Sequence, residues 1–241
     1  MGSILMYDAA KPSERPAAPR GREGVTATVH YLTPPSQKPS MAPSAAVSSA
    51  KRALDFMIAA FALLVFLPLF MVIAVAVRFE SPGNALFRQR RTGLGGKVFT
   101  ILKFRTMNVS EDDGDIRHAT RHDARITTLG LILRKTSLDE IPQLFNVLRG
   151  DMSIVGPRPH ALAHDDYYGE RVATYNQRFR ARPGLTGLAQ VRGYRGEIHD
   201  LKGMADRISA DNEYIDSWSL WRDIWLIICT LPLMLKDPNA Y

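Results

Sequence analysis

The sequence predicts a membrane-associated α/β protein, in which an apolar helix near the N-terminus is followed by a small mixed α/β body. Three observations support this prediction. A long apolar run extends from Ala53 to Val77, two strand-like segments follow it, and several helical segments come after residue 125. The chain of 241 residues is long enough for one domain with appendages.

The chain is basic, with a formal net charge of +7 and a pI near 9.7. This charge favours an anionic partner such as a phosphate substrate, a nucleic acid or lipid head groups. The cations are dispersed and no recognised nucleic-acid-binding module occurs, so we expect no nucleic acid. The single cysteine, Cys229, excludes a disulfide framework and a cysteine-based zinc site, and fits a reducing compartment.

Residues 1–50 form a tail rich in Pro, Ala and Ser. The tail has little hydrophobic periodicity and cannot bury enough apolar surface to fold alone, so we predict that it is disordered. A signal peptide is not indicated, because the apolar run Ile4–Met6 is short and Asp8 follows it.

Residues 51–80 are predicted to form a reentrant membrane helix. About 20 apolar residues suffice to cross a bilayer, and a core helix rarely stays apolar on every face for so long. Lys51 and Arg52 precede the run, and four cations follow it: Arg78, Arg88, Arg90 and Arg91. The positive-inside rule therefore favours both ends in the cytoplasm. Pro68 would break or kink the helix. A helix that enters one leaflet and returns satisfies both facts, and a kinked single span is the alternative.

A β-hairpin is predicted at the start of the body, which spans residues 81–241. Strand-like segments at Ala85–Phe87 and Val98–Phe104 flank a glycine turn at residues 93–96. The turn lacks the Gly-Lys-Ser/Thr ending of a phosphate-binding P-loop. Lys103 and Arg105 are two residues apart and would share one face of a strand.

Residues 108–124 are polar and acidic, which predicts a surface loop or a short helix. His118 and His122 have the spacing of a shared helical face. Without a carboxylate or cysteine at a zinc-site spacing, solvated histidines are the better interpretation. The acidic residues of this segment are Glu111, Asp112, Asp113 and Asp115.

The stretch from residue 135 to residue 146 places two adjacent carboxylates, Asp139 and Glu140, at the predicted start of a helix. Ser137 and Glu140 match a capping box, and Asp139 is an equally good cap. Pro142 fits only near a helix start. Free N–H groups of a first turn favour negative charge there, so a carboxylate could act as a nucleophile or a metal ligand. A capped surface helix is the alternative. Cations lie on both sides in the sequence: Arg134, Lys135, Arg149 and Arg158.

Glycine and proline mark the segments after this helix. Gly150 is a natural C-terminal cap. Pro157 and Pro159 fix the backbone on both sides of Arg158, and a preordered arginine fork suits a phosphate. A rigid loop with an exposed arginine is the alternative. Between Arg182 and residue 193, tight turns could bring backbone amides near a ligand, or simply precede a strand.

The C-terminal region combines tryptophans with a short apolar run. Trp218, Trp221 and Trp225 lie beside the run Leu226–Leu235, which Pro232 interrupts. About ten apolar residues are too few to span a bilayer. The tryptophans favour helices at the membrane interface, and a core-packing helix is the alternative.

Five segments in the same order resemble the bacterial sugar transferase family. These proteins are monotopic polyprenyl-phosphate phosphoglycosyl transferases, and the short type starts exopolysaccharide assembly. The resemblance covers about residues 50–241 and leaves the tail outside. The segments are Lys103–Met107, Ser137–Glu140, Leu144–Ser153, Val155–Pro159 and Arg182–Gly187.

The resemblance implies transfer of a hexose-1-phosphate from a UDP-hexose to undecaprenyl phosphate, with release of UMP and a covalent phosphosugar enzyme. Asp139 matches the family's nucleophile and Glu140 the residue that binds Mg²⁺, a metal that takes few protein ligands. Glucose or galactose is a guess by analogy. The substrate-binding positions assigned from the resemblance are Lys103, Arg105, Arg134, Pro157, Arg158 and Arg182.

The resemblance also implies the bacterial inner membrane, with the catalytic body on its cytoplasmic face in contact with membrane lipids. One departure concerns the break in the membrane helix, where Leu67-Pro68 replaces the Ser-Pro that the family often has. The proline that bends the helix remains, but the hydrogen bonds of a serine are lost. A homodimer is a hypothesis without a motif behind it.

Two other functions fit parts of the sequence. A non-catalytic membrane scaffold for anionic partners explains the anchor and the charge, but not the paired carboxylates or the Pro-Arg-Pro element. A lipid-phosphate hydrolase would differ in using water, rather than a lipid phosphate, as the acceptor.

Overall fold

The computed structural model describes residues 44–108, 123–196 and 200–236. Most of the predicted tail and of the acidic segment, including His118 and His122, lies outside the described residues. A short helix, α1 (Ser44–Val47), begins the described part, so helical structure starts before the boundary predicted at residue 51.

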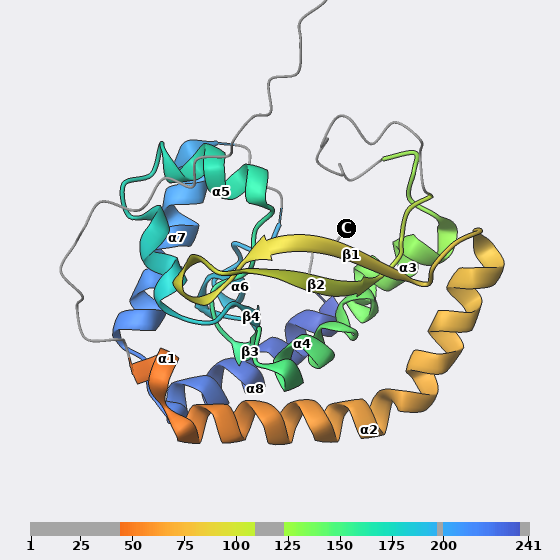
Figure 1. Ribbon diagram of the computed structural model, residues 1–241, viewed down its shortest axis with the longest axis horizontal. Helices are drawn as coiled ribbons and strands as arrows, with labels where there is room; N and C mark the ends of the chain where they lie inside the picture. The colour runs from red at the N-terminus through yellow and green to blue at the C-terminus, as the bar shows by residue number, and fades with distance from the viewer. Residues whose placement is uncertain (1–43, 109–122, 197–199, 237–241) are drawn as a thin grey trace, which may run out of the picture. The chain divides into compact units, whose positions relative to one another are not determined.

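The apolar run forms one helix, α2 (Ser49–Glu80), of 32 residues. The Ser48 hydroxyl caps its start by accepting a hydrogen bond from the Lys51 amide. The helix continues through Pro68, and Figure 1 shows α2 running beneath the body and then turning towards the strand that follows. Within the described ranges, α2 is the one helix long and apolar enough to cross a membrane. Its exposed side chains include Phe61, Leu64, Met71, Val72 and Phe79.

The predicted hairpin is confirmed. Strands β1 (Leu86–Thr92) and β2 (Val98–Phe104) pair antiparallel, and the turn η1 (Leu94–Gly96) joins them. β1 extends five residues beyond the predicted strand end at Phe87, because every residue up to Thr92 finds a partner on β2.

Helix α4 (Gln143–Arg149) fastens the hairpin through one buried amide. Asn146 Oδ1 accepts the Leu102 amide at 3.0 Å, and Asn146 Nδ2 donates to the Thr100 carbonyl at 2.7 Å. Gly150, in the left-handed region at φ 92°, ends α4 as predicted. Two elements precede α4, namely α3 (Thr128–Thr136) and η2 (Leu138–Glu140).

A parallel pair of short strands brings the two glycine-rich segments together. β3 (Ser153–Val155) lies beside β4 (Gly184–Thr186). A Cβ atom on Gly156 would lie 2.3 Å from the Arg182 carbonyl oxygen, so only glycine allows this contact. The glycines thus serve close backbone packing beside the Arg158 loop. Three further elements follow β3, namely α5 (Leu162–Gly169), η3 (Tyr175–Arg180) and α6 (Leu188–Val191).

The two C-terminal helices are α7 (Leu201–Asp216) and α8 (Leu220–Lys236). α8 is amphipathic: Leu226 is fully buried, whereas Trp221 is 80% exposed and Trp225 is 52% exposed. One face of α8 therefore packs in the core, and the other presents large apolar side chains to the surroundings.

The main hydrophobic core connects α2 to the rest of the body. The Phe70 ring of α2 lies 4.8 Å from the Phe104 ring and 5.8 Å from the Phe145 ring, measured between centroids. Fully or nearly fully buried members of this core are Ala59, Val77, Ile101, Phe104, Val147, Met152, Val155 and Leu226.

Candidate active site

The paired carboxylates lie on the 3-10 turn η2, between two helices. Ser137 ends α3 at φ 58°, the one non-glycine residue with positive φ in the described ranges. The predicted capping box is wrong, because the Ser137 hydroxyl caps no backbone N–H and instead accepts a hydrogen bond from Arg195 at 2.5 Å. The alternative of Asp139 as the cap is also wrong. α4 begins at Gln143 behind Pro142, whose fixed φ suits a helix start, so the carboxylates precede that helix.

Two cations hold the Glu140 carboxylate. Lys103 Nζ and Arg158 Nη2 each lie 2.8 Å from Glu140 Oε1. Glu140 is 9% exposed. Burial raises the pKa of Glu140, but Arg158 and Lys103 outweigh burial and hold this pKa well below its ordinary value. Glu140 therefore stays ionised, and its Oε1 atom holds the charged ends of Lys103 and Arg158 close together.

The Asp139 carboxylate has a different environment. Asp139 is also 9% exposed, but in the described part of the chain its carboxylate accepts no hydrogen bond. Burial raises the pKa of Asp139 to about 6, with Lys103 opposing the shift and Glu140 adding to it. At neutral pH the Asp139 carboxylate is ionised and poorly solvated, and it accepts no hydrogen bond from the described residues. This is the state of an activated nucleophile.

Arg134 is close enough to Asp139 to lower its pKa. Arg134 Nε donates to the Thr106 hydroxyl at 2.9 Å, and this bond ties α3 to the segment after β2. The structure thus gathers Lys103, Arg134 and Arg158 around the two carboxylates.

Arg105 and Arg182 are engaged elsewhere. Arg105 is buried and donates to the carbonyls of Ser81 and Pro82, where α2 leads into β1. Arg182 donates to the carbonyls of Gly150 and Ala46. Each arginine satisfies carbonyl groups that end or follow a helix, which indicates a structural role for both.

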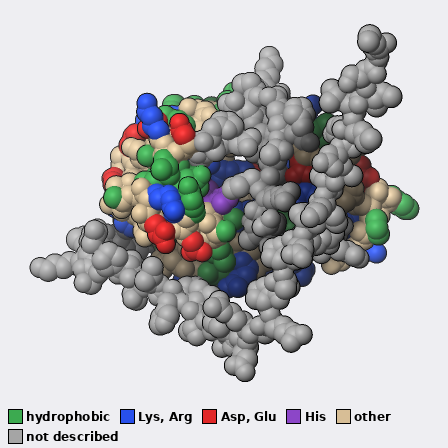
Figure 2. Space-filling model, turned by 90° about the horizontal axis from the view of Figure 1, so that it is seen from above, with side chains coloured by type: hydrophobic (Ala, Val, Ile, Leu, Met, Phe, Trp, Pro, Cys, Tyr) green, Lys and Arg blue, Asp and Glu red, His purple; other side chains and the backbone are tan. Residues whose placement is uncertain are grey.

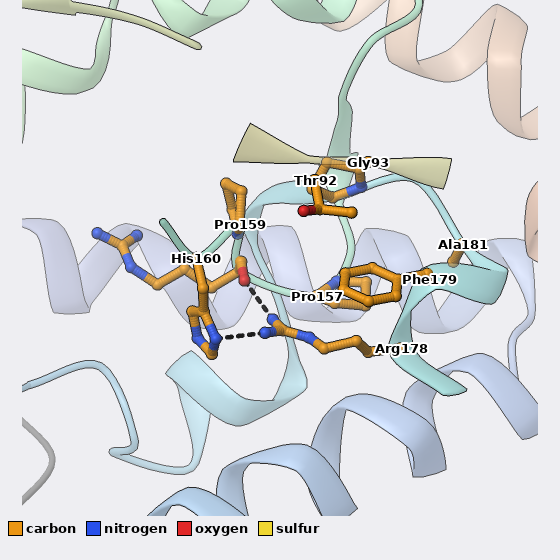
Figure 3. Close-up of a pocket in the computed structure, with 10 residues that line it drawn as sticks. Thr92, Gly93, Pro157, Pro159, His160, Arg178, Phe179 and Ala181 are labelled. Carbon is orange, nitrogen blue, oxygen red and sulfur yellow. Dashed lines mark hydrogen bonds between the residues drawn. The ribbon is translucent and has the colours of Figure 1, made fainter. Parts of the chain in front are cut away.

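The Arg158 loop rests on a buried polar network (Figure 3). Arg178 Nη2 donates to the backbone carbonyl of Arg158 and to Asp211 Oδ2, the latter at 3.1 Å. Arg178 Nη1 donates to His160 Nδ1 at 2.5 Å. Burial and Arg178 hold the pKa of His160 well below its ordinary value, so His160 is neutral.

Pro157 contributes to the site by fixing the backbone next to Arg158. It lines a small pocket under the end of β1, together with Thr92, Pro159 and Phe179. The two prolines fix the chain that presents Arg158.

Sequence reasoning missed Arg178 and Asp211. They lie 33 residues apart and belong to no motif spacing, and their ion pair is only 2% exposed at each side chain. A paired arginine and aspartate at such a distance gives no local signal. Only the adjacent Arg-Phe-Arg pattern around Arg178 marks the region as basic.

Figure 2 views the molecule from above, on the side away from α2 in Figure 1. Basic side chains show near the centre of this face, beside a histidine, with acidic side chains further out.

Comparison with known proteins decides the family. The family model for bacterial sugar transferases matches residues 46–237. The chain belongs to the bacterial sugar transferase family. The match includes every candidate site residue and leaves out most of the N-terminal tail.

Several relatives of this sugar transferase have curated names. It is 56% identical over 199 residues to a UDP-glucose:undecaprenyl-phosphate glucose-1-phosphate transferase of Caulobacter vibrioides, covering 83% of this chain and 74% of that protein. A transferase of the same name from Escherichia coli is 48% identical, over 79% of this chain and 41% of that protein. The exopolysaccharide production protein ExoY of Rhizobium meliloti is 38% identical, over 80% and 88% respectively. The chain thus spans about two fifths of the Escherichia coli relative.

Proposed function

We propose that this sugar transferase moves glucose-1-phosphate from UDP-glucose to undecaprenyl phosphate, as a first step of exopolysaccharide or glycan assembly. The observation that supports this most strongly is the pair of unlike carboxylates: Glu140 is held by two cations, and Asp139 beside it is unengaged. The names of the relatives with 46–56% identity support glucose as the sugar.

The chemistry is a double displacement at one phosphorus atom. An Asp139 carboxylate oxygen attacks the phosphorus that bears glucose, and the bond from that phosphorus to the UMP oxygen breaks with its electron pair leaving on UMP. A phosphate oxygen of the lipid then attacks the same phosphorus. The aspartyl–phosphorus bond breaks, the carboxylate is regenerated, and the lipid diphosphate sugar leaves.

The cations supply charge stabilisation for both displacements. Phosphoryl transfer depends mainly on positioning and on neutralising the charge of the equatorial oxygens. Lys103 and Arg158 converge on Glu140 Oε1, and Arg134 lies close to Asp139. These groups would hold the diphosphate of the donor with its central bond beside Asp139.

Glu140 would also hold Mg²⁺. Its Oε1 is engaged by both cations, whereas the one hydrogen bond to Oε2 from the described residues is a long contact of 3.5 Å to Arg158 Nη1. A carboxylate oxygen held only by this long contact fits a metal that takes few protein ligands and completes its shell with phosphate oxygens and water. When bound, Mg²⁺ neutralises charge on the diphosphate.

Helix α2 would enter the membrane from one face and return to the same face. Both ends of α2 contact the same body: Lys51 lies 2.7 Å from Asp223 of α8, and the Glu80 carboxylate accepts a hydrogen bond from the Leu129 amide of α3 at 2.8 Å. A helix that spans the bilayer would have its ends on opposite faces, and one body could not contact both ends. A bent helix that dips into the cytoplasmic leaflet of the inner membrane would place the site near lipid phosphates, with the exposed tryptophans of α8 at the interface.

The test is UMP release by the purified full chain in detergent, with undecaprenyl phosphate, Mg²⁺ and a panel of UDP-sugars. We expect release with UDP-glucose and formation of a lipid-linked product. Release of inorganic phosphate from the lipid would indicate a hydrolase instead. A folded protein that releases UMP from no UDP-sugar would contradict the proposal and favour the scaffold.

A further inference from the structure

A cation of β1 that no motif singled out, Arg91, lies on the hairpin face that carries Lys103. Arg91 is the cross-strand partner of Phe99, and Lys103 is the partner of Phe87. Directly opposed residues of an antiparallel pair share a face, and every second residue along a strand does so too. Arg91 and Lys103 therefore project to the same side of the hairpin, the side on which Lys103 meets Glu140.

The backbone also brings Arg91 to the loop that carries Arg158. Arg91 forms an isolated antiparallel bridge with Ala161, three residues after Arg158. Burial and then Arg158 lower the pKa of Arg91 to about 10, while Asp165 and Glu140 act in the opposite direction. Arg91 is thus charged at neutral pH and within electrostatic reach of the site.

Arg91 has little to compensate its charge. Its Nη2 donates to Gln89 Oε1 at 2.5 Å, and its Nε is buried without a partner. In the described ranges, it forms no ion pair. The two carboxylates that act on it make their hydrogen bonds elsewhere. Asp165 Oδ1 accepts the Tyr175 hydroxyl at 2.7 Å while its Oδ2 is buried without a hydrogen-bond partner among the described residues, and Glu140 is shared by Lys103 and Arg158. A partly desolvated cation without an ion-pair partner is costly, and a bound anion would reduce that cost.

We propose that Arg91 binds a phosphate group of a substrate, beside Arg158. This assignment rests on the proposed function. Lys103, Arg134, Arg158 and Arg91 then carry four positive charges against the three carboxylates of Asp139, Glu140 and Asp165, an excess of one. The diphosphate of a nucleotide sugar carries two negative charges, and the fork of a guanidinium suits such a group. The phosphate of the lipid acceptor has the same chemistry and is the other source of the anion.

The experiment compares Arg91→Gln with Arg88→Gln in the full chain. Arg88 is exposed and lies on the other face of the same strand, opposite Leu102, so its loss is the matched control. Steady-state rates are measured with UDP-glucose and undecaprenyl phosphate varied in turn, and UMP release is measured separately without the lipid.

We expect Arg91→Gln to raise a substrate KM by about tenfold or more, as for a lost hydrogen bond to a charged group. A raised KM for UDP-glucose with slower lipid-free UMP release would identify the donor diphosphate as the anion. A raised KM for the lipid alone would identify the acceptor phosphate. Both KM values within twofold of wild type, in a variant that melts like wild type, would overturn the proposal.

Arg91→Lys tests the same assignment if Arg91→Gln does not fold. It keeps the charge and loses the fork, so the same KM should rise by a smaller factor, and unchanged KM values would again overturn the assignment. A failure of the proposed function can be told apart from a failure of the Arg91 assignment. In the first case the wild-type chain itself releases UMP from no UDP-sugar.

Discussion

Lys51, in the first turn of α2, and Asp223, in α8, form a buried ion pair of 2.7 Å although 172 residues separate them. Asp223 also accepts hydrogen bonds from the Tyr214 hydroxyl at 2.7 Å and from Trp218 Nε1 at 3.0 Å. Lys51 donates in addition to the Val155 carbonyl at 3.1 Å. One ion pair thus joins the apolar helix, β3 and the C-terminal helix, which explains why a charged residue stands at the edge of the apolar run.

Lys51→Met should destabilise the fold strongly. The change leaves Asp223 buried without its counter-charge, which costs about 3–5 kcal/mol of unfolding free energy. Denaturant unfolding in detergent measures the effect. Lys97→Met in the exposed hairpin turn is the control, with an expected change within about 0.5 kcal/mol. Equal stabilities of the two variants would show that the pair is not what fastens α2.

The rate of lipid-free UMP release should fall as the pH drops through about 6, the pKa to which burial raises Asp139. Protonation removes the nucleophile, and the rate should then fall about tenfold per pH unit. Omitting the lipid matters, because phosphate monoesters titrate near pH 6 themselves. A flat profile from pH 7.5 to pH 5 would contradict the role of Asp139.

The same shift has a consequence for stability. The pKa of Asp139 is higher in the folded state than its ordinary value of 3.8, so the folded chain binds this proton more tightly than the unfolded chain does. Ionisation of Asp139 therefore lowers stability as the pH rises from about 4 to about 6. Asp139→Asn, which is neutral at every pH, should melt at or above the temperature of wild type at pH 7.5. A lower melting temperature would mean that the carboxylate has stabilising partners.

Glu140→Gln should reduce turnover by about 100-fold and raise the Mg²⁺ concentration needed for half-maximal rate. The amide removes the charge that holds Lys103 and Arg158 together. Glu213→Gln is the control, because Glu213 is exposed and paired with Arg192 and Arg222 outside the site. A Mg²⁺ dependence identical to that of wild type would exclude Glu140 as the metal ligand.

Arg178 and Asp211 should act on catalysis through the position of Arg158. Replacing both by apolar residues, as in Arg178→Met with Asp211→Leu, removes a buried pair at little cost in stability. The Arg158 carbonyl nevertheless loses its donor. We expect kcat/KM for UDP-glucose to fall about tenfold or more while the melting temperature stays within a few degrees. Full activity in a folded double variant would show that the loop holds Arg158 without this support.

The elements with strong local patterns could be predicted from the sequence. The length and uniform hydrophobicity of α2, the glycine turn of the hairpin and the cap at Gly150 all follow from neighbouring residues. The reentrant insertion of α2 stays a prediction.

The site could be predicted only in part. Asp139, Glu140, Lys103, Arg134 and Arg158 come together as motif order and resemblance indicated. The left-handed Ser137 could not be foreseen, because Ser-x-x-Glu has the pattern of a capping box and its actual partner, Arg195, lies 58 residues away. The carbonyl groups that engage Arg105 and Arg182 are likewise set by tertiary contacts, which no local pattern encodes.

The most direct test of Asp139 as the nucleophile is mass spectrometry of the full chain after incubation with UDP-glucose and Mg²⁺ in the absence of lipid. We expect one hexose phosphate added per chain, located on the peptide that contains Asp139, absent in Asp139→Asn and discharged by undecaprenyl phosphate. UMP release by wild type without any such adduct, or an adduct on another residue, would contradict this role of Asp139.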